Sequence, residues 1–296
     1  MTSPDNATDQ TATPSTRKPL DEEIDVYGMT HTGNVRKVNQ DHFLISSLQK
    51  RMQVYHTSLP DVDHLLLGGE RLAYLAMVAD GVGGGTGGEE ASRVTIKVVS
   101  QYIARSMECY YTADASDEAF LEALHEAAMQ CHASVVQRAE EDSDQRRMAT
   151  TLTLFIGVWP RAYLLQVGDS RCYMYRDGKL TLITRDQTMA EELIDSGVLS
   201  RSGAFNTRWA HVLSSSIGGQ QTAPVVTRFD SAWHQVVLLC SDGLTKHVSE
   251  NQISEYLGNM TSAKQVCEDL LQAALDDGGS DNITVLVGRA VHKDSE

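Results

Sequence analysis

The sequence predicts an α+β fold in which antiparallel sheets carry helices packed on their outer faces. Segments with the alternation and β-branched content of strands arrive in runs, and helical segments fall between or after these runs. The regular alternation of strand and helix that a parallel sheet requires is missing from the pattern. With 296 residues, of which 41% are hydrophobic, the chain is long enough to bury a large core.

Eight segments carry the apolar alternation and the β-branched and aromatic residues typical of strands. They cover residues 25–30, 43–46, 73–79, 151–158, 162–167, 171–176, 235–240 and 283–289. After the sixth segment, Asp177-Gly178 predicts a tight hairpin turn, because this pair readily adopts the left-handed backbone of such turns.

Five segments repeat apolar residues at helical spacing. They cover about 89–107 and 117–140, a short stretch after Thr188, and residues 250–257 and 262–275. Three begin with helix-start signals, which are the acidic pair Glu89-Glu90, Ser249 with Gln252, and Ser262 with Gln265.

The pattern indicates one folded domain, residues 23–291, between two tails. Residues 1–22 are rich in Thr, Ser, Asp and Pro, so we expect a disordered tail that cannot bury enough apolar surface to fold. Residues 292–296 would form a short C-terminal tail. Residues 48–70 have no clear period and are interpreted as an insertion between two strands.

Composition excludes several classes of function. The formal net charge of −15 argues against non-specific nucleic-acid binding, which needs Lys and Arg to neutralise phosphates. The apolar stretches are too short to span a bilayer, and we expect no secretory signal. Five scattered cysteines argue against a disulfide framework or a zinc site and favour a reducing, cytoplasmic compartment.

Four aspartates stand at the ends of apolar strands, each with a glycine close by. Asp80, Asp169 and Asp242 follow such strands, and Asp281 precedes one. A single Asp-Gly pair usually marks only a turn. Four acids in the same context favour a site for hard divalent ions such as Mg²⁺ and Mn²⁺, which prefer oxygen ligands.

A fifth acid, Asp41, lies between Arg36 and another strand. Considered alone, Arg36 is typical of a surface cation and Asp41 of a turn or capping residue. Beside a metal pair, however, a guanidinium would suit a phosphate monoester, because its planar fork can bind two phosphate oxygens.

The glycine-rich stretch 81–88 offers a rival interpretation. Gly83, Gly85 and Gly88 fit the dinucleotide-binding pattern G-x-G-x-x-G, after a strand and before a helix. Such a unit needs a second parallel strand ending in an acid about 20 residues further on. This chain is expected to be helical there, so dinucleotide binding is disfavoured.

Together these segments resemble the metal-dependent protein phosphatase 2C family in its bacterial form. Their order and spacing agree from about residue 25 to 290. The matching segments are 36–41, 78–84, 87–92, 148–151, 167–171, 213–218, 239–245 and 280–284.

The resemblance implies a four-layer α-β-β-α sandwich, two antiparallel sheets flanked by helices, with metals in a cleft between the sheet edges. Asp80 would bridge two Mn²⁺ or Mg²⁺ ions, and the Gly81 carbonyl would bind one of them. Asp242 and Asp281 would hold the other ion. Asp169, with Asp242, would match the acids that hold a third, weaker metal.

The resemblance also implies a reaction, the hydrolysis of phosphoserine and phosphothreonine in proteins. A hydroxide bridging the metals would attack phosphorus directly, without a phosphoenzyme. Arg36 would bind the substrate phosphate, and Asp41 would lie beside the metal pair, as a ligand or one step removed. Phosphoproteins and a cognate Ser/Thr kinase would be the partners of a monomeric enzyme.

Three departures from the family pattern bear on mechanism. Position 82 is valine, where many eukaryotic relatives carry a histidine proposed as general acid. Gln187 replaces the histidine that commonly follows the aspartate at position 186. Residues 188–212, which correspond to a flap near the active site, match poorly. The alternative function is a catalytically silent phosphatase-like scaffold that binds a phosphoprotein, which loss of a core ligand would mark.

Overall fold

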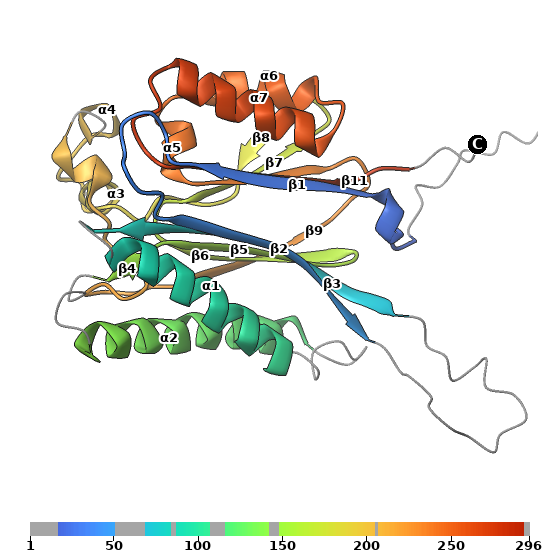
Figure 1. The fold of residues 1–296 in the computed structure, drawn as a ribbon, viewed down its shortest axis with the longest axis horizontal. Coiled ribbons are helices and arrows are strands. Elements are labelled where there is room, and N and C mark those ends of the chain that lie inside the picture. Colours follow the sequence, from blue (N-terminus) through green and yellow to red (C-terminus); the bar gives the residue numbers. More distant parts are fainter. Residues whose placement is uncertain are drawn as a thin grey trace, which may run out of the picture.

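The computed structural model describes residues 17–50, 69–83, 87–106, 116–141, 148–204 and 207–292. In this part of the chain two antiparallel sheets lie face to face, and each carries helices on its outer side (Figure 1). The expected α+β fold, a four-layer α-β-β-α sandwich, is therefore confirmed.

The first sheet has the strand order β1-β11-β10-β7-β8. Its strands are β1 (Ile24–His31), β7 (Arg171–Arg176), β8 (Lys179–Leu182), β10 (Val236–Cys240) and β11 (Ile283–Ala290). Its outer face is covered by α5 (Asp242–Thr245), α6 (Glu250–Gly258) and α7 (Ala263–Asp276). Leu270 of α7 and Val285 of β11 are fully buried in the core between these layers.

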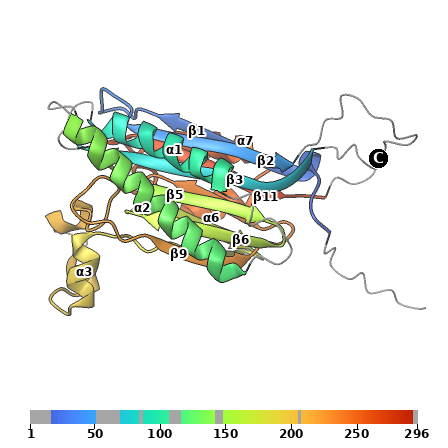
Figure 2. The ribbon, with the colours of Figure 1, turned by 90° about the horizontal axis from the view of Figure 1, so that it is seen from below.

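The second sheet has the order β2-β3-β5-β6-β9, and β4 pairs with β3. Its strands are β2 (Asp41–Lys50), β3 (Glu70–Val82), β4 (Ala149–Thr150), β5 (Leu152–Val158), β6 (Arg161–Val167) and β9 (Val225–Asp230). Figure 2 shows α1 (Gly87–Ser106) and α2 (Asp117–Glu141) across its outer face. Met77, Leu124 and Leu154 belong to the core beneath them.

A third apolar cluster joins the inner faces of the two sheets. Val78 and Leu164 of the second sheet belong to it together with Cys172, Leu239 and Leu286 of the first. The central strands are therefore buried on both faces. This explains why they are almost continuously apolar in sequence instead of alternating strictly with polar residues.

All five expected helices form, with ends within about two residues of those expected from the pattern. Ser249 and Gln252 make the reciprocal bonds of a capping box at the start of α6. Ser262 accepts from the Gln265 N–H at the start of α7. Thr188 caps α3 (Met189–Asp195) by accepting from the Glu191 N–H.

The expected flap, residues 188–212, contains three short helices in its described part. They are α3, α4 (Arg201–Ala204) and η4 (Arg208–His211). Figure 1 shows α3 and α4 at the same end of the sandwich as the loop that joins β1 to β2. The flap therefore lies beside the strand ends at which the aspartates were predicted.

The boundaries of the folded part differ from those expected. Residues 1–16 of the expected tail, 51–68 of the expected insertion and 293–296 of the C-terminal tail lie outside the described residues. Residues 17–22 are packed on the domain, because Arg17 pairs with Glu23 and Arg71 pairs with Asp21. Residues 48–50 and 70, expected in the insertion, belong to β2 and β3. None of the described helices is both long and apolar enough to cross a membrane.

Candidate metal centre

The strand ends that carry the predicted acids meet at one end of the sandwich. Asp41 begins β2 and lies directly opposite Asp80 near the end of β3 in the antiparallel ladder. In the other sheet, the Ser241 N–H at the end of β10 donates to the Thr284 carbonyl near the start of β11, at 3.1 Å. Asp242 follows Ser241 directly, so it lies close to the start of β11. Thr284 at this end of β11 contacts Asp41 of the second sheet, and the acids of both sheets therefore lie at the same end of the sandwich.

Asp41 joins the two sheets. The hydroxyl of Thr284, on β11, donates to its Oδ2 at 2.7 Å. Its other oxygen, Oδ1, is buried without a hydrogen-bond partner. Burial raises the pKa of Asp41 to about 6, against the lowering effect of the Thr284 bond. A buried carboxylate oxygen without a donor is costly, so this atom indicates a missing positive partner.

The backbone at Asp80-Gly81 is held on both sides. The Asp80 N–H donates to Thr151 Oγ1 at 3.0 Å, and Thr150 Oγ1 donates to the Asp80 carbonyl at 2.8 Å. A side chain at Gly81 would collide with the carbonyl oxygens of Gly88 and Gln40. Only glycine fits this position, which accounts for its place in the motif. Burial, followed by repulsion from the neighbouring acids, raises the pKa of Asp80 well above its usual value.

One ammonium contacts both Asp242 and Asp281, which shows that the two carboxylates lie side by side. Lys246 Nζ is 2.6 Å from Asp242 Oδ2 and 2.7 Å from Asp281 Oδ2. Arg36 adds a two-pronged contact, with its Nε 2.7 Å from Asp281 Oδ1 and its Nη2 2.9 Å from Oδ2. Burial would raise the pKa of Asp281, but the bonds from Arg36 and Lys246 lower it.

Asp169 lies in the turn between β6 and β7. Gly168 has a φ of +101°, a conformation that favours glycine. Gln187 holds this turn, since it accepts from the Gly168 N–H through its Oε1 at 2.8 Å. The residue that replaces the family's histidine thus supports the acid's backbone. Burial, and then the charges of Asp242 and Asp186, raise the pKa of Asp169 to about 8.

A cleft of about 280 Å³ opens between these acids and the flap. Its lining includes Asp169, Asp242 and Lys246 on the side of the sheets, and Glu191 and Ile194 of α3 on the other. The cleft combines charged and apolar side chains. It can therefore accommodate a polar group near Lys246 and an apolar group against the flap.

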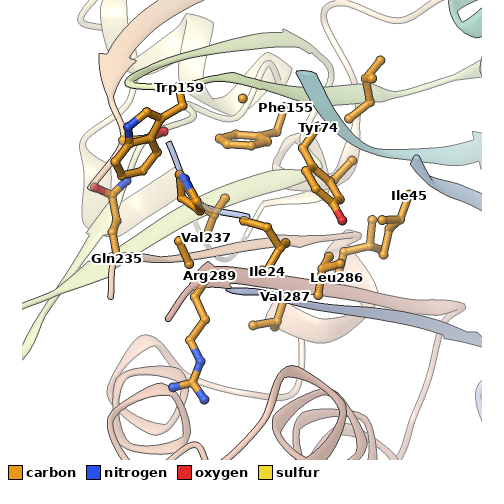
Figure 3. Close-up of a pocket in the computed structure, with 18 of the residues that line it drawn as sticks. Ile24, Ile45, Tyr74, Phe155, Trp159, Gln235, Val237, Leu286, Val287 and Arg289 are labelled. Atoms are coloured by element: carbon orange, nitrogen blue, oxygen red, sulfur yellow. The ribbon is translucent and has the colours of Figure 1, made fainter. Parts of the chain in front are cut away.

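A second cavity, about 120 Å³ in volume, lies at the opposite end of the sandwich. Figure 3 shows Tyr74 and Phe155 of one sheet facing Ile24 and Leu286 of the other. Ile24 pairs with Ala290 at the far ends of β1 and β11, away from the acids. Mainly apolar side chains line this cavity, together with Lys18, Arg71 and Arg289, and among the described residues its lining holds no acid that could bind a metal ion.

The sequence interpretation missed several residues that shape the site. Lys246 was not singled out, although it lies four residues after Asp242 and hence on the same side of one helical turn. Thr284 was considered only as part of a motif. The same holds for Asn282, whose side-chain amide donates to the carbonyls of Thr32 and Val38 and so holds the loop that carries Arg36.

The residues present fit divalent ions in their chemistry. The donors are carboxylates and a glycine carbonyl, which suit hard cations. Asp41 Oδ1 has no partner, and the pKa values of Asp41, Asp80 and Asp169 are raised by burial and mutual repulsion. Among the described residues, no three side chains of His, Cys, Asp or Glu are grouped as an ion cage. Lys246 and Arg36 contact the acids of one half of the centre instead.

Two packed sheets whose strand ends bring several acids to one cleft are typical of a class of proteins that bind divalent cations there. The chain belongs to the protein phosphatase 2C family, whose model matches residues 38–278. The matched segment includes every described strand except β1 and β11, and every predicted acid except Asp281, which lies three residues beyond it.

Two curated relatives illustrate the similarity. The chain is 32% identical over 222 residues to the serine/threonine protein phosphatase PstP of Mycobacterium tuberculosis, covering 75% of this chain and 41% of that protein. It is 30% identical over 216 residues to the serine/threonine phosphatase Stp of Listeria monocytogenes, covering 72% and 83%. The match thus spans less than half the length of PstP.

Solved structures agree with this relationship. The crystal structure of M. tuberculosis PstP superimposes with a TM-score of 0.72 at 28% identity, covering 91% of this chain and 99% of that one. A structure of the PstP catalytic domain in complex with two manganese ions has a TM-score of 0.69 at 28% identity, with the same coverage.

Proposed function

We propose that this protein is a metal-dependent serine/threonine protein phosphatase, which hydrolyses phosphoserine and phosphothreonine in proteins. The observation that carries the proposal is that Asp41, Asp80, Asp242 and Asp281 are brought from both sheets to one end of the sandwich. Membership of the family and the activities in the names of its relatives support it.

The metal ligands are assigned by residue. Asp80, Gly81, Asp242 and Asp281 would hold two Mn²⁺ or Mg²⁺ ions, and Asp169, with Asp242, would hold a third, weaker one. The PstP catalytic domain in complex with two manganese ions supports a two-metal centre. Bound ions would supply Lewis-acid activation of water and of the phosphate oxygens.

The chain's own residues bind and orient the substrate. Arg36 lies at the rim of the centre with 53% of its side chain exposed, so its fork can reach a phosphate while it stays close to Asp281. There it would neutralise charge on the non-bridging oxygens as the ester bond breaks. Asp41, fixed by Thr284, would lie beside the metal pair, as a ligand or one step removed.

The partners and location follow from the cleft and the cysteines. A phosphorylated segment of a protein would lie in the 280 Å³ cleft beside the flap, and a cognate Ser/Thr kinase would supply it. We expect a monomer. The four cysteines in the described residues are free and buried, which supports a cytoplasmic location.

A catalytically silent scaffold is disfavoured. Such a protein would be marked by the loss of a core acid, whereas Asp80, Asp242 and Asp281 are all present and close together. No feature of the described site favours phosphoprotein binding without turnover.

The test is phosphate release from a phosphoserine peptide with Mn²⁺ and with excess chelator. We expect turnover that depends on Mn²⁺ and is lost in Asp80→Asn, since the proposed bridging ligand loses its charge. The variant should remain folded, because the substitution removes a charge that burial and its neighbours oppose. Folded wild-type protein without metal-dependent turnover would contradict the proposal.

A further inference from the structure

The Lys246 ammonium lies in the half of the centre assigned to a metal ion. Lys246 directly follows α5, and its N–H donates to the Asp242 carbonyl at 2.9 Å, closing one helical turn. This turn places Asp242 and Lys246 on the same side of the chain. The ammonium then reaches across to Asp281, which belongs to the segment before β11.

The backbone, and not Lys246, brings the two carboxylates together. A side chain at Gly243 would collide with the Asn282 carbonyl oxygen, so the backbone after Asp242 is packed directly on the backbone after Asp281. Ser241 and Thr284 link the same two segments through a backbone bond of 3.1 Å and a bond from the Thr284 N–H to Ser241 Oγ of 2.9 Å. The pair of acids would remain adjacent without the lysine.

The ammonium and a divalent ion cannot share these oxygens. Lys246 Nζ lies within 2.7 Å of Oδ2 on both acids. Mg²⁺ binds such oxygens at about 2.0–2.1 Å and would have to occupy nearly the same space. Two positive centres so close together would also repel strongly at an edge where the acids are only 21% and 18% exposed.

We propose that Lys246 is a built-in counter-ion that occupies the position between Asp242 and Asp281 in the metal-free protein and must be displaced for a divalent ion to bind there. Lys246 stabilises the metal-free fold. It also lowers the affinity for a divalent ion at Asp242 and Asp281 relative to the affinity at Asp80 and Gly81. The inference rests on the proposed function only in taking Asp242 and Asp281 as metal ligands.

The displaced side chain has space in the cleft. Lys246 itself lines the 280 Å³ cleft, together with the acids Asp186 and Glu191. A lysine has a flexible four-carbon stem, so its ammonium can move several ångströms without a change in the backbone. Metal binding would then move a positive charge from the acids into the region proposed for the substrate.

The test is calorimetric titration of Mn²⁺ into chelator-treated wild-type protein, Lys246→Met and Lys97→Met. Methionine keeps an unbranched apolar stem and removes the charge. Lys97, exposed on α1, provides the control for a change in net charge alone. We expect one Mn²⁺ site of Lys246→Met to be about tenfold tighter, because metal no longer displaces an ammonium held by two carboxylates, while Lys97→Met matches wild type.

Thermal melting supplies a readout without metal or activity. In chelator, Lys246→Met should melt about 2–4 °C below wild type, since Asp242 and Asp281 lose their shared counter-ion, and saturating Mn²⁺ should remove the difference. If Lys246→Met does not fold without metal, Lys246→Gln carries the same expectations.

Unchanged or weaker Mn²⁺ binding in the Lys246 variants would overturn the inference, as would unchanged melting in chelator. Failure of the proposed function has a different signature. In that case wild-type protein itself would bind no Mn²⁺, or would bind it with the same affinity in Asp80→Asn.

Discussion

The acids of the centre differ in how their charges are balanced. Arg36 and Lys246 both contact Asp281, whose pKa is lowered, whereas burial and repulsion raise the pKa of Asp80. Asp41 has one oxygen bound by Thr284 and the other without a partner. Of these described acids, the negative charges without a cationic partner are therefore those of Asp41 and Asp80 on the second sheet, and Asp80 is the proposed bridging ligand.

Arg36→Ala should impair substrate binding more than it impairs metal binding. The fork of Arg36 is the phosphate ligand proposed at the rim, and Asp281 keeps its contact with Lys246 when Arg36 is removed. We expect kcat/KM for a phosphoserine peptide to fall about 10- to 100-fold, mainly through KM. Arg36→Lys should recover only part of this loss, because an ammonium cannot make the two-pronged contact.

Steady-state kinetics at saturating Mn²⁺, together with Mn²⁺ titration of each variant, separates the two effects. An unchanged kcat/KM for Arg36→Ala would remove this residue from the substrate site. A large loss of Mn²⁺ affinity would instead make it a support for Asp281.

Thr284→Val should destabilise the metal-free protein. The Thr284 hydroxyl donates to Asp41 Oδ2, and the nearly isosteric valine would leave that buried oxygen without a donor. We expect the free energy of unfolding in chelator to fall by about 1–3 kcal/mol, as measured by urea denaturation.

Thr30→Val is the matched control for Thr284→Val. Thr30 Oγ1 hydrogen-bonds to Thr284 Oγ1 at 2.8 Å and accepts from the Asn39 side-chain amide at 2.8 Å, but among the described residues no hydrogen bond joins it to Asp41. The control should therefore cost less than Thr284→Val. Equal losses for the two variants would show that the hydroxyl pair matters and the bond to Asp41 does not.

At the scale of elements, apolar strands and amphipathic helices were predictable, and one exposed edge strand and the shortest helices were not. β7 was predicted with its observed ends, and β11 to within one residue, because central strands need apolar side chains on both faces. β9 was missed, since it lies at a sheet edge with most of its residues partly or fully exposed. The short α4 and η4 carry too few residues for a helical period to be visible.

Gly243→Ala should separate the two elements that position Asp242 and Asp281. An added Cβ would collide with the Asn282 carbonyl oxygen and push α5 away from the segment before β11. We expect a loss of about 1–3 kcal/mol in the free energy of unfolding, with weaker Mn²⁺ binding, measured by denaturation and calorimetry.

Gly288→Ala is the control within the same sheet. Its Cβ would meet Val26 Cγ2 at 3.4 Å, an ordinary contact, at the other end of β11. Its Mn²⁺ affinity should match wild type. If Gly243→Ala also bound Mn²⁺ normally, the close packing of α5 on the segment before β11 would not be needed for metal binding.

At the scale of the whole molecule, the candidate site is made by the meeting of the two sheets. The resemblance implies one centre for Asp80, Asp242 and Asp281, and in the structure the charges of Asp242 and Asp281 lie near enough to raise the pKa of Asp80. The sequence pattern could not predict the contacts between the sheets, such as the bond from Thr284 to Asp41. It also could not predict that Lys246 contacts Asp242 and Asp281. These depend on side-chain directions after the sandwich closes, and no sequence period encodes them.

Because both sheets contribute acids, metal binding should stabilise the whole sandwich and not only its edge. A ligand at 100 times its Kd adds about 2.7 kcal/mol to the free energy of unfolding. For a chain of this size we expect saturating Mn²⁺ to raise the Tm by about 5–10 °C relative to chelator. Differential scanning calorimetry should show one transition that shifts as a unit, since one apolar cluster contains buried residues of both sheets. Asp80→Asn should lose most of the shift while its metal-free Tm stays at or above that of wild type, because the proposed bridging acid loses its charge and with it the repulsion from its neighbours. A shift that survives in Asp80→Asn would place the stabilising ion elsewhere on this acidic protein, and a second transition insensitive to Mn²⁺ would mean that one sheet and its helices unfold independently of the centre.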